Sequence, residues 1–382
     1  MKICLINNLY GQFGRGGGSE QVTEIIAKGL SNHDIFTIST KPYSAQVADN
    51  GKDYYLNSLF PNLASLPIFL RLFWHLFNMF GWYRAGQIKK ILKKIKPDLV
   101  ITNNLMGLSY LTPRVIHGLK IKHVHVLHDI QLMHPSGIMY LGEEGKINSL
   151  PAKIYTAKNK RCFKDVDLVI APSKWILDLH LKQGLFKNIT TKHLLNPKDQ
   201  SIEFNNDQAL IKQDFFFSVG QLTEHKGIKL LLDVFEELNT GEEKFKLKIV
   251  GIGALETEVK AAVERCSEIE YLGKLPNHEV QKLMRQANCF IIPALVYENS
   301  PTVILEAMKN NLPTIGSDLG GIAELLQSKF LLFNPDKESL KERVLVAQKH
   351  RQELYQEFQK IKQRIYQPTV SEYFAEIKKE LW

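Results

Sequence analysis

The sequence has little of what would place it outside the ordinary globular proteins. Only four of its 382 residues are cysteines, and their spacing matches neither a disulfide framework nor a zinc site. Cys4 and Cys289 lie in apolar runs that we expect to be strands, which indicates buried thiols in a reducing compartment such as the cytoplasm. There is no low-complexity tract or internal repeat. The opening MKICLINN reads as a strand and lacks the features of a signal peptide.

Common nucleic-acid and phosphate motifs are also missing. The glycine cluster Gly16–Gly18 is neither a G-x-G-x-x-G fingerprint nor a P-loop, because no Lys-Ser/Thr pair follows it. Asp165 and Asp167 imitate a D-x-D metal motif but lead directly into an apolar strand, so we expect no metal there. The net charge of +9 fits nucleic acid, an anionic membrane or a phosphorylated substrate. Without a nucleic-acid motif, the last two are favoured.

No acidic residue occurs between Tyr54 and Pro97. Within this region, residues 66–82 are strongly apolar, but one helix of that length would span only roughly 26 Å, short of a comfortable bilayer crossing. Residues 84–96 then carry six basic side chains. Two interpretations stay open: a helix lying on an anionic membrane, or a helix packed on the core with solvated lysines.

Short apolar runs alternate with helical patterns along the N-terminal half. Such an alternation predicts an α/β fold with a parallel sheet covered on both faces. Ligands of these sheets bind at the carboxyl ends of the strands. The predicted strands are Ile3–Ile6, Ile35–Ile38, Leu99–Thr102, Val124–Leu127, Leu168–Ala171 and His193–Leu195.

A second alternation of the same kind begins at Phe215, after a polar stretch. The length predicts two to three domains, and the polar stretch predicts a boundary near residue 200, with a hinge over 196–212. We therefore expect one domain over 1–200 and another over 201–367.

The most informative stretch is Cys289–Glu324. It reads as strand, polar loop, helix from about Thr302, strand over Leu312–Gly316, and a Gly-Gly turn, with Ser300 as helix cap and Pro301 at the first helical position. A helix that begins directly after a buried strand offers N–H groups to a phosphate. Carboxylates nearby would repel a phosphate, so the two glutamates are expected to bind neutral hydroxyls. A nucleotide-sugar supplies both groups.

The motif E-N-S-P-T-V-I-L-E, two glutamates separated by seven residues, resembles the signature of family 4 retaining glycosyltransferases, which have the GT-B fold. The resemblance implies two Rossmann-like domains facing each other across a cleft. The first would bind the acceptor and the second the nucleotide-sugar donor. The last helix, within 368–382, would cross back onto the first domain.

The resemblance also assigns residues of the donor site. Lys226 would present its ammonium to the diphosphate. Gln221 stands where the family usually has arginine, and a protonated His225 would compensate for the missing charge. Gly251 and Gly253 would form a turn beside the nucleotide, with Tyr271–Leu275 flanking the base. The full predicted donor set is Gly17, Gly18, Gln221, Lys226, Gly251, Leu275, Glu298, Asn299, Ser300, Pro301, Thr302, Val303 and Glu306.

His128 ends a predicted strand, which places its ring at the ligand-binding edge of the sheet beside Asp129. By resemblance, this histidine would contact the transferred sugar or the acceptor. His134 and Pro135 lie in the adjoining loop. The glycine-rich loop with Ser19 as the cap of the next helix would approach the donor or acceptor. The predicted catalytic residues are His128, Lys226 and Glu298.

The expected function is sugar transfer with retention of configuration, from a UDP- or GDP-type donor, without metal or other cofactor. The acceptor is expected to be a lipid-linked or cell-surface glycan intermediate at the cytoplasmic face of the membrane, with the protein as a peripheral membrane enzyme. No nucleic-acid partner is expected. A nucleotide-sugar epimerase and a non-catalytic nucleotide-sugar-binding protein are the alternatives.

Overall fold

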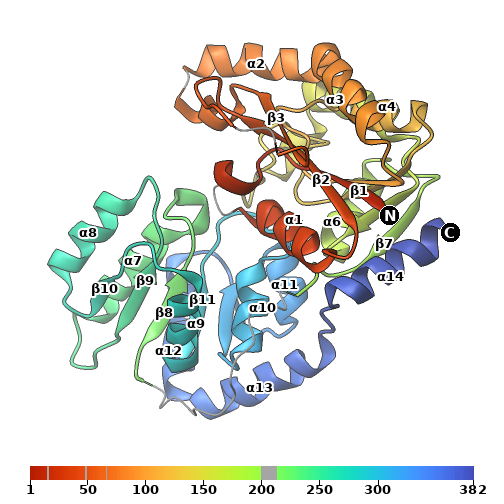
Figure 1. The fold of residues 1–382 in the computed structure, drawn as a ribbon. Coiled ribbons are helices and arrows are strands. Elements are labelled where there is room, and N and C mark those ends of the chain that lie inside the picture. The colour runs from red at the N-terminus through yellow and green to blue at the C-terminus, as the bar shows by residue number, and fades with distance from the viewer. Residues whose placement is uncertain (15–16, 48–49, 66, 199–212) are drawn as a thin grey trace. The chain divides into compact units, whose positions relative to one another are not determined.

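A computed structural model describes residues 1–14, 17–47, 50–65, 67–198 and 213–382. The chain forms two compact units, each an α/β layer structure (Figure 1). The first contains Met1–Ile138, Gly145–Glu203 and Gln367–Trp382, and the second contains Met139–Glu144 and Phe204–Tyr366. Most of the predicted hinge, 199–212, lies outside the described residues.

The six-residue segment Met139–Glu144 belongs to the second unit, although the sequence analysis placed it in the first domain. Its backbone explains the assignment. Tyr140 forms an antiparallel bridge with Val296, and the N–H of Tyr297 donates to the carbonyl of Met139 at 2.9 Å. Nothing in the local pattern marks this pairing, because the partner strand is more than a hundred residues away.

The first sheet has seven parallel strands in the order β3-β2-β1-β4-β5-β6-β7. The inner strands are apolar and buried because helices cover both faces. Both edge strands depart from the predictions: β3 was missed, and β7 lies earlier than the predicted 193–195, because edge strands with one exposed face lack a continuous apolar run. The bounds are β1 (Lys2–Ile6), β2 (Asp34–Lys41), β3 (Asp53–Asn57), β4 (Leu99–Thr102), β5 (Lys122–Val126), β6 (Leu168–Ala171) and β7 (Thr190–His193).

Helices connect these strands and cover the sheet (Figure 1). They are α1 (Gly18–Gly29), α2 (Ile68–Phe80), α3 (Trp82–Ile95), α4 (Thr112–Gly118), α5 (Leu150–Phe163), α6 (Lys174–Lys182) and the C-terminal α14 (Val370–Leu381). Short 3₁₀ turns are η1 (Gly11–Phe13), η2 (Phe60–Ser65) and η3 (Glu144–Asn148).

The apolar and basic stretches form two successive helices, α2 and α3. Gly81 separates α2 from α3 with a φ of +35°, and a Cβ at this position would lie 2.5 Å from Ser109 Oγ. The apolar face of α3 packs on the core through Ile88, Leu92 and Ile95, while its lysines stay exposed, so a membrane contact of the lysines stays a prediction. Among the described residues, no helix has the length and apolarity needed to span a bilayer.

The C-terminal helix α14 packs on the first unit, as predicted. Its buried side chains join a core formed with β1, α1 and β6, and they are Val370, Tyr373, Phe374, Ile377 and Leu381. The close approach of α14 to α1 requires a glycine. A Cβ on Gly29 would lie 2.5 Å from the Cβ of Val370.

The second sheet has six parallel strands in the order β10-β9-β8-β11-β12-β13. The strand order reverses between β8 and β11, which is where ligands of open α/β sheets bind. The strands are β8 (Phe216–Val219), β9 (Leu247–Val250), β10 (Ile269–Tyr271), β11 (Cys289–Ile292), β12 (Thr314–Ser317) and β13 (Leu332–Phe333).

The helices of the second unit follow its strands. They are η4 (Glu224–Lys226), α7 (Ile228–Leu238), α8 (Glu256–Arg265), α9 (Asn277–Gln286), α10 (Thr302–Lys309), α11 (Gly320–Leu326), α12 (Lys337–Lys349) and α13 (Arg351–Arg364). The predicted Gly-Gly turn is wrong. Gly320 and Gly321 are the first residues of α11.

Candidate active site

The loop after β8 carries Lys226 and is fastened to the segment after β11. Gly227 adopts a φ of +72°, and a Cβ there would lie 1.7 Å from the carbonyl oxygen of Pro293. The N–H of Leu295 donates to the carbonyl of His225 at 2.9 Å. Both loops leave the sheet at the point where the strand order reverses. The backbone therefore fixes the position of Lys226 at the predicted ligand edge.

Lys226 pairs with Glu298, a residue 72 positions later in the chain. The Nζ atom of Lys226 lies 2.5 Å from Oε1 of Glu298, and both side chains are half-buried. The sequence analysis expected these residues to contact different parts of the donor and did not predict that they meet. An ammonium has three donors, so Lys226 can keep this partner and still bind an anion.

The start of α10 differs from the prediction. Pro301 is the N-cap, Thr302 is the first helical residue, and no side chain caps the helix, so Ser300 is not the cap. Pro301 has extended backbone angles, which places Ser300 one residue too early for that role. The Ser300 hydroxyl is buried with no hydrogen-bond partner among the described residues. A buried hydroxyl in this state beside a helix N-terminus fits a bound polar group.

Gly321 holds the loop that contains Glu298 and Asn299. Its N–H donates to the carbonyl of Glu298 at 2.7 Å, and a Cβ on Gly321 would lie 1.4 Å from the carbonyl oxygen of Asn299. Any side chain at this position would displace the loop. The second glycine of the pair is therefore needed for a close backbone approach, not for a turn.

Glu306 belongs to a polar network that the sequence did not reveal. Its Oε2 accepts from Nε2 of the buried Gln281 at 2.8 Å. The Oε1 of Gln281 accepts in turn from Nδ2 of Asn310 at 2.6 Å. Because Gln281 uses both its amide nitrogen and its amide oxygen in this network, the Glu306 carboxylate is held in one orientation.

The glycines after β9 have a structural explanation. Gly251 has a φ of +144°, and its Cβ would lie 1.8 Å from the carbonyl oxygen of Gly220, while a Cβ on Gly253 would lie 2.3 Å from that of Leu222. The Tyr271 hydroxyl donates to the carbonyl of Gly251 at 2.9 Å. These contacts support the loop after β8. A role of Gly251 beside a nucleotide stays a prediction.

Two other predicted donor residues flank this part of the second unit. Gln221 is exposed in the loop after β8, and Leu275 is half-buried just before α9.

Burial lowers the pKa of His225, and the neighbouring Lys226 lowers it further although Glu298 acts against this. His225 is therefore neutral near pH 7 and does not replace the charge that an arginine at position 221 would supply.

In the first unit, the glycine-rich loop leads directly into α1. Gly17 is the N-cap and Gly18 the first helical residue, so the predicted cap, Ser19, lies inside the helix. The Gly17 N–H donates to the carboxylate of Glu20 at 3.4 Å. Gly16 lies outside the described residues. Contact of Gly17 or Gly18 with a substrate stays a prediction.

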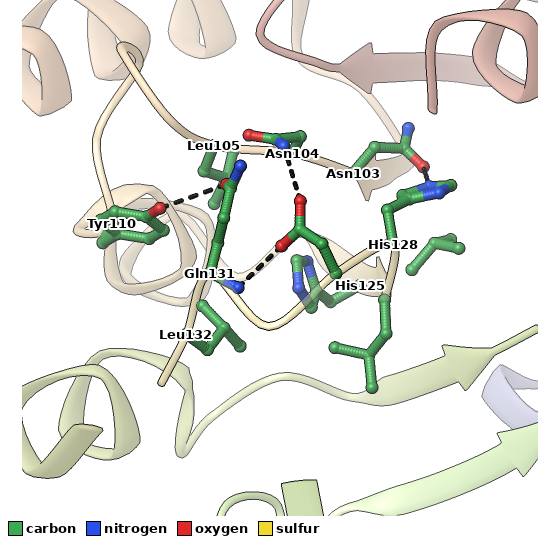
Figure 2. Close-up of a pocket in the computed structure, with 11 residues that line it drawn as sticks. Asn103, Asn104, Leu105, Tyr110, His125, His128, Gln131 and Leu132 are labelled. Atoms are coloured by element: carbon green, nitrogen blue, oxygen red, sulfur yellow. Dashed lines mark hydrogen bonds between the residues drawn. The ribbon is translucent and has the colours of Figure 1, made fainter. Parts of the chain in front are cut away.

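A small cavity lies beside the residues that follow β4 and β5 (Figure 2). β5 ends at Val126, two residues before His128. The His128 ring Nε2 lies 2.8 Å from Oδ1 of Asn103. The Asp129 carboxylate accepts from Nδ2 of Asn104 at 3.1 Å and from the N–H of Gln131 at 2.7 Å. These side chains meet because parallel strands end at one edge of the sheet.

Burial sets the charges in this cavity. It lowers the pKa of His128 to about 4, so the ring is neutral near pH 7. Burial raises the pKa of Asp129 to about 7, although the hydrogen bond from the Gln131 N–H acts against this. The cavity measures about 20 Å³, which is room for about one water molecule and not for a sugar ring.

The remaining candidates of the first unit have structural partners. Nδ1 of His134 lies 2.8 Å from the hydroxyl of Ser136, and Pro135 lies between them in the loop. Asp167 accepts from the N–H of His123 at 2.8 Å, which ties the start of β6 to β5. Within residues 1–14, 17–47, 50–65, 67–198 and 213–382, no cluster of His, Cys, Asp or Glu is arranged for a metal.

The structure thus brings Lys226 and Glu298 together and adds three residues that the sequence analysis missed. Asn103 follows β4 at the edge where His128 follows β5, so the rule about strand ends could have identified it. Gln281 and Asn310 belong to neither of the predicted donor-site motifs, the stretch around Lys226 and the stretch Glu298–Glu306. Their pairing with Glu306 depends on helix packing, which leaves no local signal.

Two family models match almost the whole chain in succession. The model described as Glycosyltransferase Family 4 matches residues 16–191, and the model described as Glycosyl transferases group 1 matches residues 200–364. These segments fall mostly in the first and second unit, respectively.

Similar proteins occur among bacterial sequences and solved structures. An uncharacterized 42.6 kDa protein in the cps region of Klebsiella pneumoniae is 26% identical, over 85% of this chain and 87% of its own. The putative teichuronic acid biosynthesis glycosyltransferase TuaC of Bacillus subtilis is 24% identical, over 92% of this chain and 90% of its own. The structure of Anabaena Alr3699/HepE in complex with UDP has a TM-score of 0.69 at 17% identity, covering 100% of this chain and 99% of that one.

The two parallel sheets, the E-N-S-P-T-V-I-L-E motif and the two successive family matches agree with one another. The chain belongs to the group 1 glycosyltransferases of the GT-B fold.

Proposed function

We propose that the protein is a retaining glycosyltransferase that moves a hexosyl group from a UDP- or GDP-sugar to an acceptor in polysaccharide biosynthesis. The observation that carries the proposal is the Lys226–Glu298 pair beside the N-terminus of α10. A cation and a helix N-terminus together form a site for a diphosphate. The UDP bound by HepE and the assignment of TuaC to teichuronic acid synthesis support this choice.

The donor would be bound by separate groups of the second unit. Lys226 would bind the diphosphate through donors that Glu298 does not use, together with the first turn of α10. Glu306, oriented by Gln281, would accept from the ribose hydroxyls. Glu298 would accept from a hydroxyl of the sugar. Gln221, Leu275 and Gly251 remain proposed contacts of the nucleotide.

In the transfer step, the bond between the anomeric carbon and the diphosphate oxygen breaks, and the electron pair stays on the diphosphate. The acceptor hydroxyl attacks the same face of the sugar, and its proton passes to the leaving phosphate oxygen. Lys226 and the helix N–H groups stabilise the developing charge before it forms. Because these groups supply positive charge, we expect activity to persist in EDTA.

The first prediction concerns Lys226. Replacing Lys226 by Ala removes one charge-assisted hydrogen bond worth about 1.5–3 kcal/mol, so donor turnover should fall about 10- to 100-fold. Glu306→Ala should raise the KM of the donor. Lys229→Ala, three residues away on α7 and exposed, is the matched control and should leave the rate unchanged.

Turnover would be followed as release of the nucleoside diphosphate with and without acceptor extract. Unchanged rates in both Lys226→Ala and Glu306→Ala would refute the site. Formation of an epimer from the donor alone would indicate an epimerase. Tight donor binding without turnover on any acceptor would indicate a binding protein.

We further propose that the first unit contacts an anionic membrane on its cytoplasmic face, where a lipid-linked acceptor would reside. Trp82 and Tyr83 at the start of α3 are 73% and 75% exposed, and Phe73 on α2 is exposed as well. Aromatic side chains of this kind insert at the headgroup level, and lysines beside them bind anionic lipid. The exposed lysines of α3 are Lys89, Lys90, Lys93 and Lys94. All four cysteines are buried thiols, which fits the reducing cytoplasm.

The second prediction tests this contact. The protein should sediment with vesicles of phosphatidylglycerol and phosphatidylcholine at low salt and be released by high salt. The double variant Trp82→Ala/Tyr83→Ala should bind several-fold more weakly, while Trp382→Ala, which removes an exposed aromatic just after α14, should bind normally. Equal binding to neutral vesicles, or no effect of the double variant, would contradict the proposal.

A further inference from the structure

His128 is part of a chain of hydrogen bonds that begins on α1, and Figure 2 shows its last bond, between Asn103 and His128. The Thr23 hydroxyl lies 2.7 Å from the carbonyl oxygen of Ser19. Nδ2 of Asn103 lies 3.2 Å from the Thr23 hydroxyl oxygen. Oδ1 of Asn103 lies 2.8 Å from Nε2 of His128. All four residues of this hydrogen-bond chain lie within the first unit.

The direction of every bond in this chain follows from its first member. The Ser19 carbonyl can only accept, so the single proton of the Thr23 hydroxyl is directed to it. The Thr23 oxygen can then only accept from Asn103, which requires the amide nitrogen of Asn103 to face Thr23. The amide oxygen of Asn103 therefore faces His128. Since this oxygen can only accept, Nε2 of His128 must carry a proton.

We propose that Asn103 and Thr23 are positioning residues that hold His128 in the tautomer protonated at Nε2, leaving Nδ1 to accept a hydrogen bond from a substrate hydroxyl. The second half of this statement rests on the proposed function, whereas the tautomer does not.

Three observations support the assignment. Burial lowers the pKa of His128 to about 4, so only one ring nitrogen is protonated near pH 7. Thr23 and Asn103 are both buried, so water does not compete for their bonds. Among the described residues, none is hydrogen-bonded to Nδ1 of His128, and His128 lines the small cavity and is partly exposed.

The arrangement determines what His128 can do. A neutral ring with a proton on Nε2 presents a lone pair at Nδ1. It therefore orients a hydroxyl by accepting a hydrogen bond from it. It cannot donate to an oxygen at that position. Inversion of the Asn103 amide would reverse both roles, which is why the Thr23 hydroxyl matters although it lies two hydrogen bonds from the ring.

The tautomer can be read directly by long-range ¹H–¹⁵N correlation spectra of the full chain labelled in histidine, with the His128 signals identified by their loss in His128→Gln. At neutral pH we expect Nε2 to have a pyrrole-type shift and Nδ1 a pyridine-type shift. Thr23→Val removes the acceptor for the Asn103 amide and should shift the tautomer toward Nδ1–H. Thr23→Ser keeps the hydroxyl and should restore the wild-type spectrum.

A pyridine-type Nε2 in the wild-type protein would overturn the proposal, and so would identical spectra in Thr23→Val and the wild type. If Thr23→Val fails to fold, Asn103→Leu, which removes the acceptor for Nε2–H, provides the same test.

Activity tests the second half separately. The amide oxygen of asparagine can occupy the place of Nδ1, whereas that of glutamine reaches the place of Nε2. His128→Asn should therefore retain at least about tenfold more kcat than His128→Gln, the difference that about 1.4 kcal/mol of one hydrogen bond gives. Equal losses in both variants, with the expected spectra, would refute the acceptor role while leaving the tautomer established. The spectra require no turnover, so a failure of the proposed function would leave the test of the tautomer unaffected.

Discussion

Single residues decide how this protein responds to acid. His123 and His180 are fully buried in the first unit, and burial lowers their pKa values to about 3 and about 4. In the unfolded chain these rings take up a proton near pH 6.5. Between about pH 6.5 and 4 the unfolded state therefore binds more protons, so stability decreases as the pH falls, by about 1.4 kcal/mol per pH unit for each ring.

The third prediction is that the urea midpoint of the first unit decreases steadily from about pH 6.5 to 4.5. Asp129 acts in the opposite direction, because its pKa of about 7 lets the folded state hold a proton that the unfolded state has lost. The Asp129→Asn variant should therefore lose stability more steeply over this range. A midpoint that is flat or increases on acidification would contradict the argument.

At the same scale, the sequence predicts the position of a residue when that position depends on one strand or helix. It does not predict contacts between residues of two different elements. Lys226 and His128 follow strands, and their place at an edge of a sheet is a consequence of that. The Lys226–Glu298 pair and the Glu306–Gln281 bond join segments 72 and 25 residues apart. The predictions of Ser19 and Ser300 as helix caps were also wrong. Gly17 is the N-cap of α1 and Pro301 is the N-cap of α10.

At the scale of elements, contact between helices depends on a missing side chain. Gly29 ends α1 where α14 begins, and a Cβ there would lie 2.5 Å from Val370. The fourth prediction is that Gly29→Ala destabilises the first unit by about 1–3 kcal/mol, the usual cost of overpacking. Val370→Ala alone creates a small cavity and should also destabilise.

Combining the two changes tests the geometry. In the double variant Gly29→Ala/Val370→Ala the new methyl group occupies space left by the old side chain, so the effects should be less than additive by at least about 0.5 kcal/mol. Gly118→Ala, where a Cβ meets nothing within 4 Å, is the matched control for glycine replacement at the end of a helix. Strict additivity in thermal unfolding would show that the two positions do not interact.

Elements were predictable where both faces are buried. The inner strands β4 and β6 lie at the predicted bounds, because a run of apolar residues specifies a central parallel strand. The edge strands β3 and β7 have polar sequences, DYYLN and TTKH, and pair only through neighbours supplied by the rest of the sheet.

At the scale of the whole molecule, the first unit is completed by the last residues of the chain. α14 contributes five large buried side chains to a core whose other members come from the first half of the sequence. Burying one such side chain contributes about 1.5–3 kcal/mol, so five contribute on the order of 10 kcal/mol. This equals the stability of a typical domain. The first unit therefore cannot be stable until α14 has been synthesised and has packed onto it.

The fifth prediction follows. Removing residues 370–382 should unfold the first unit while the second, whose core lies within 204–366 apart from the short segment 139–144, keeps its fold. Hydrogen exchange should show loss of protection in β1, β4 and β6 and retention in β8 and β11. The variant Lys378→Ala/Lys379→Ala, which changes the exposed side of α14 without shortening it, is the control. If the truncated chain stayed protected in the first sheet, the core residues of α14 would contribute far less than their burial implies.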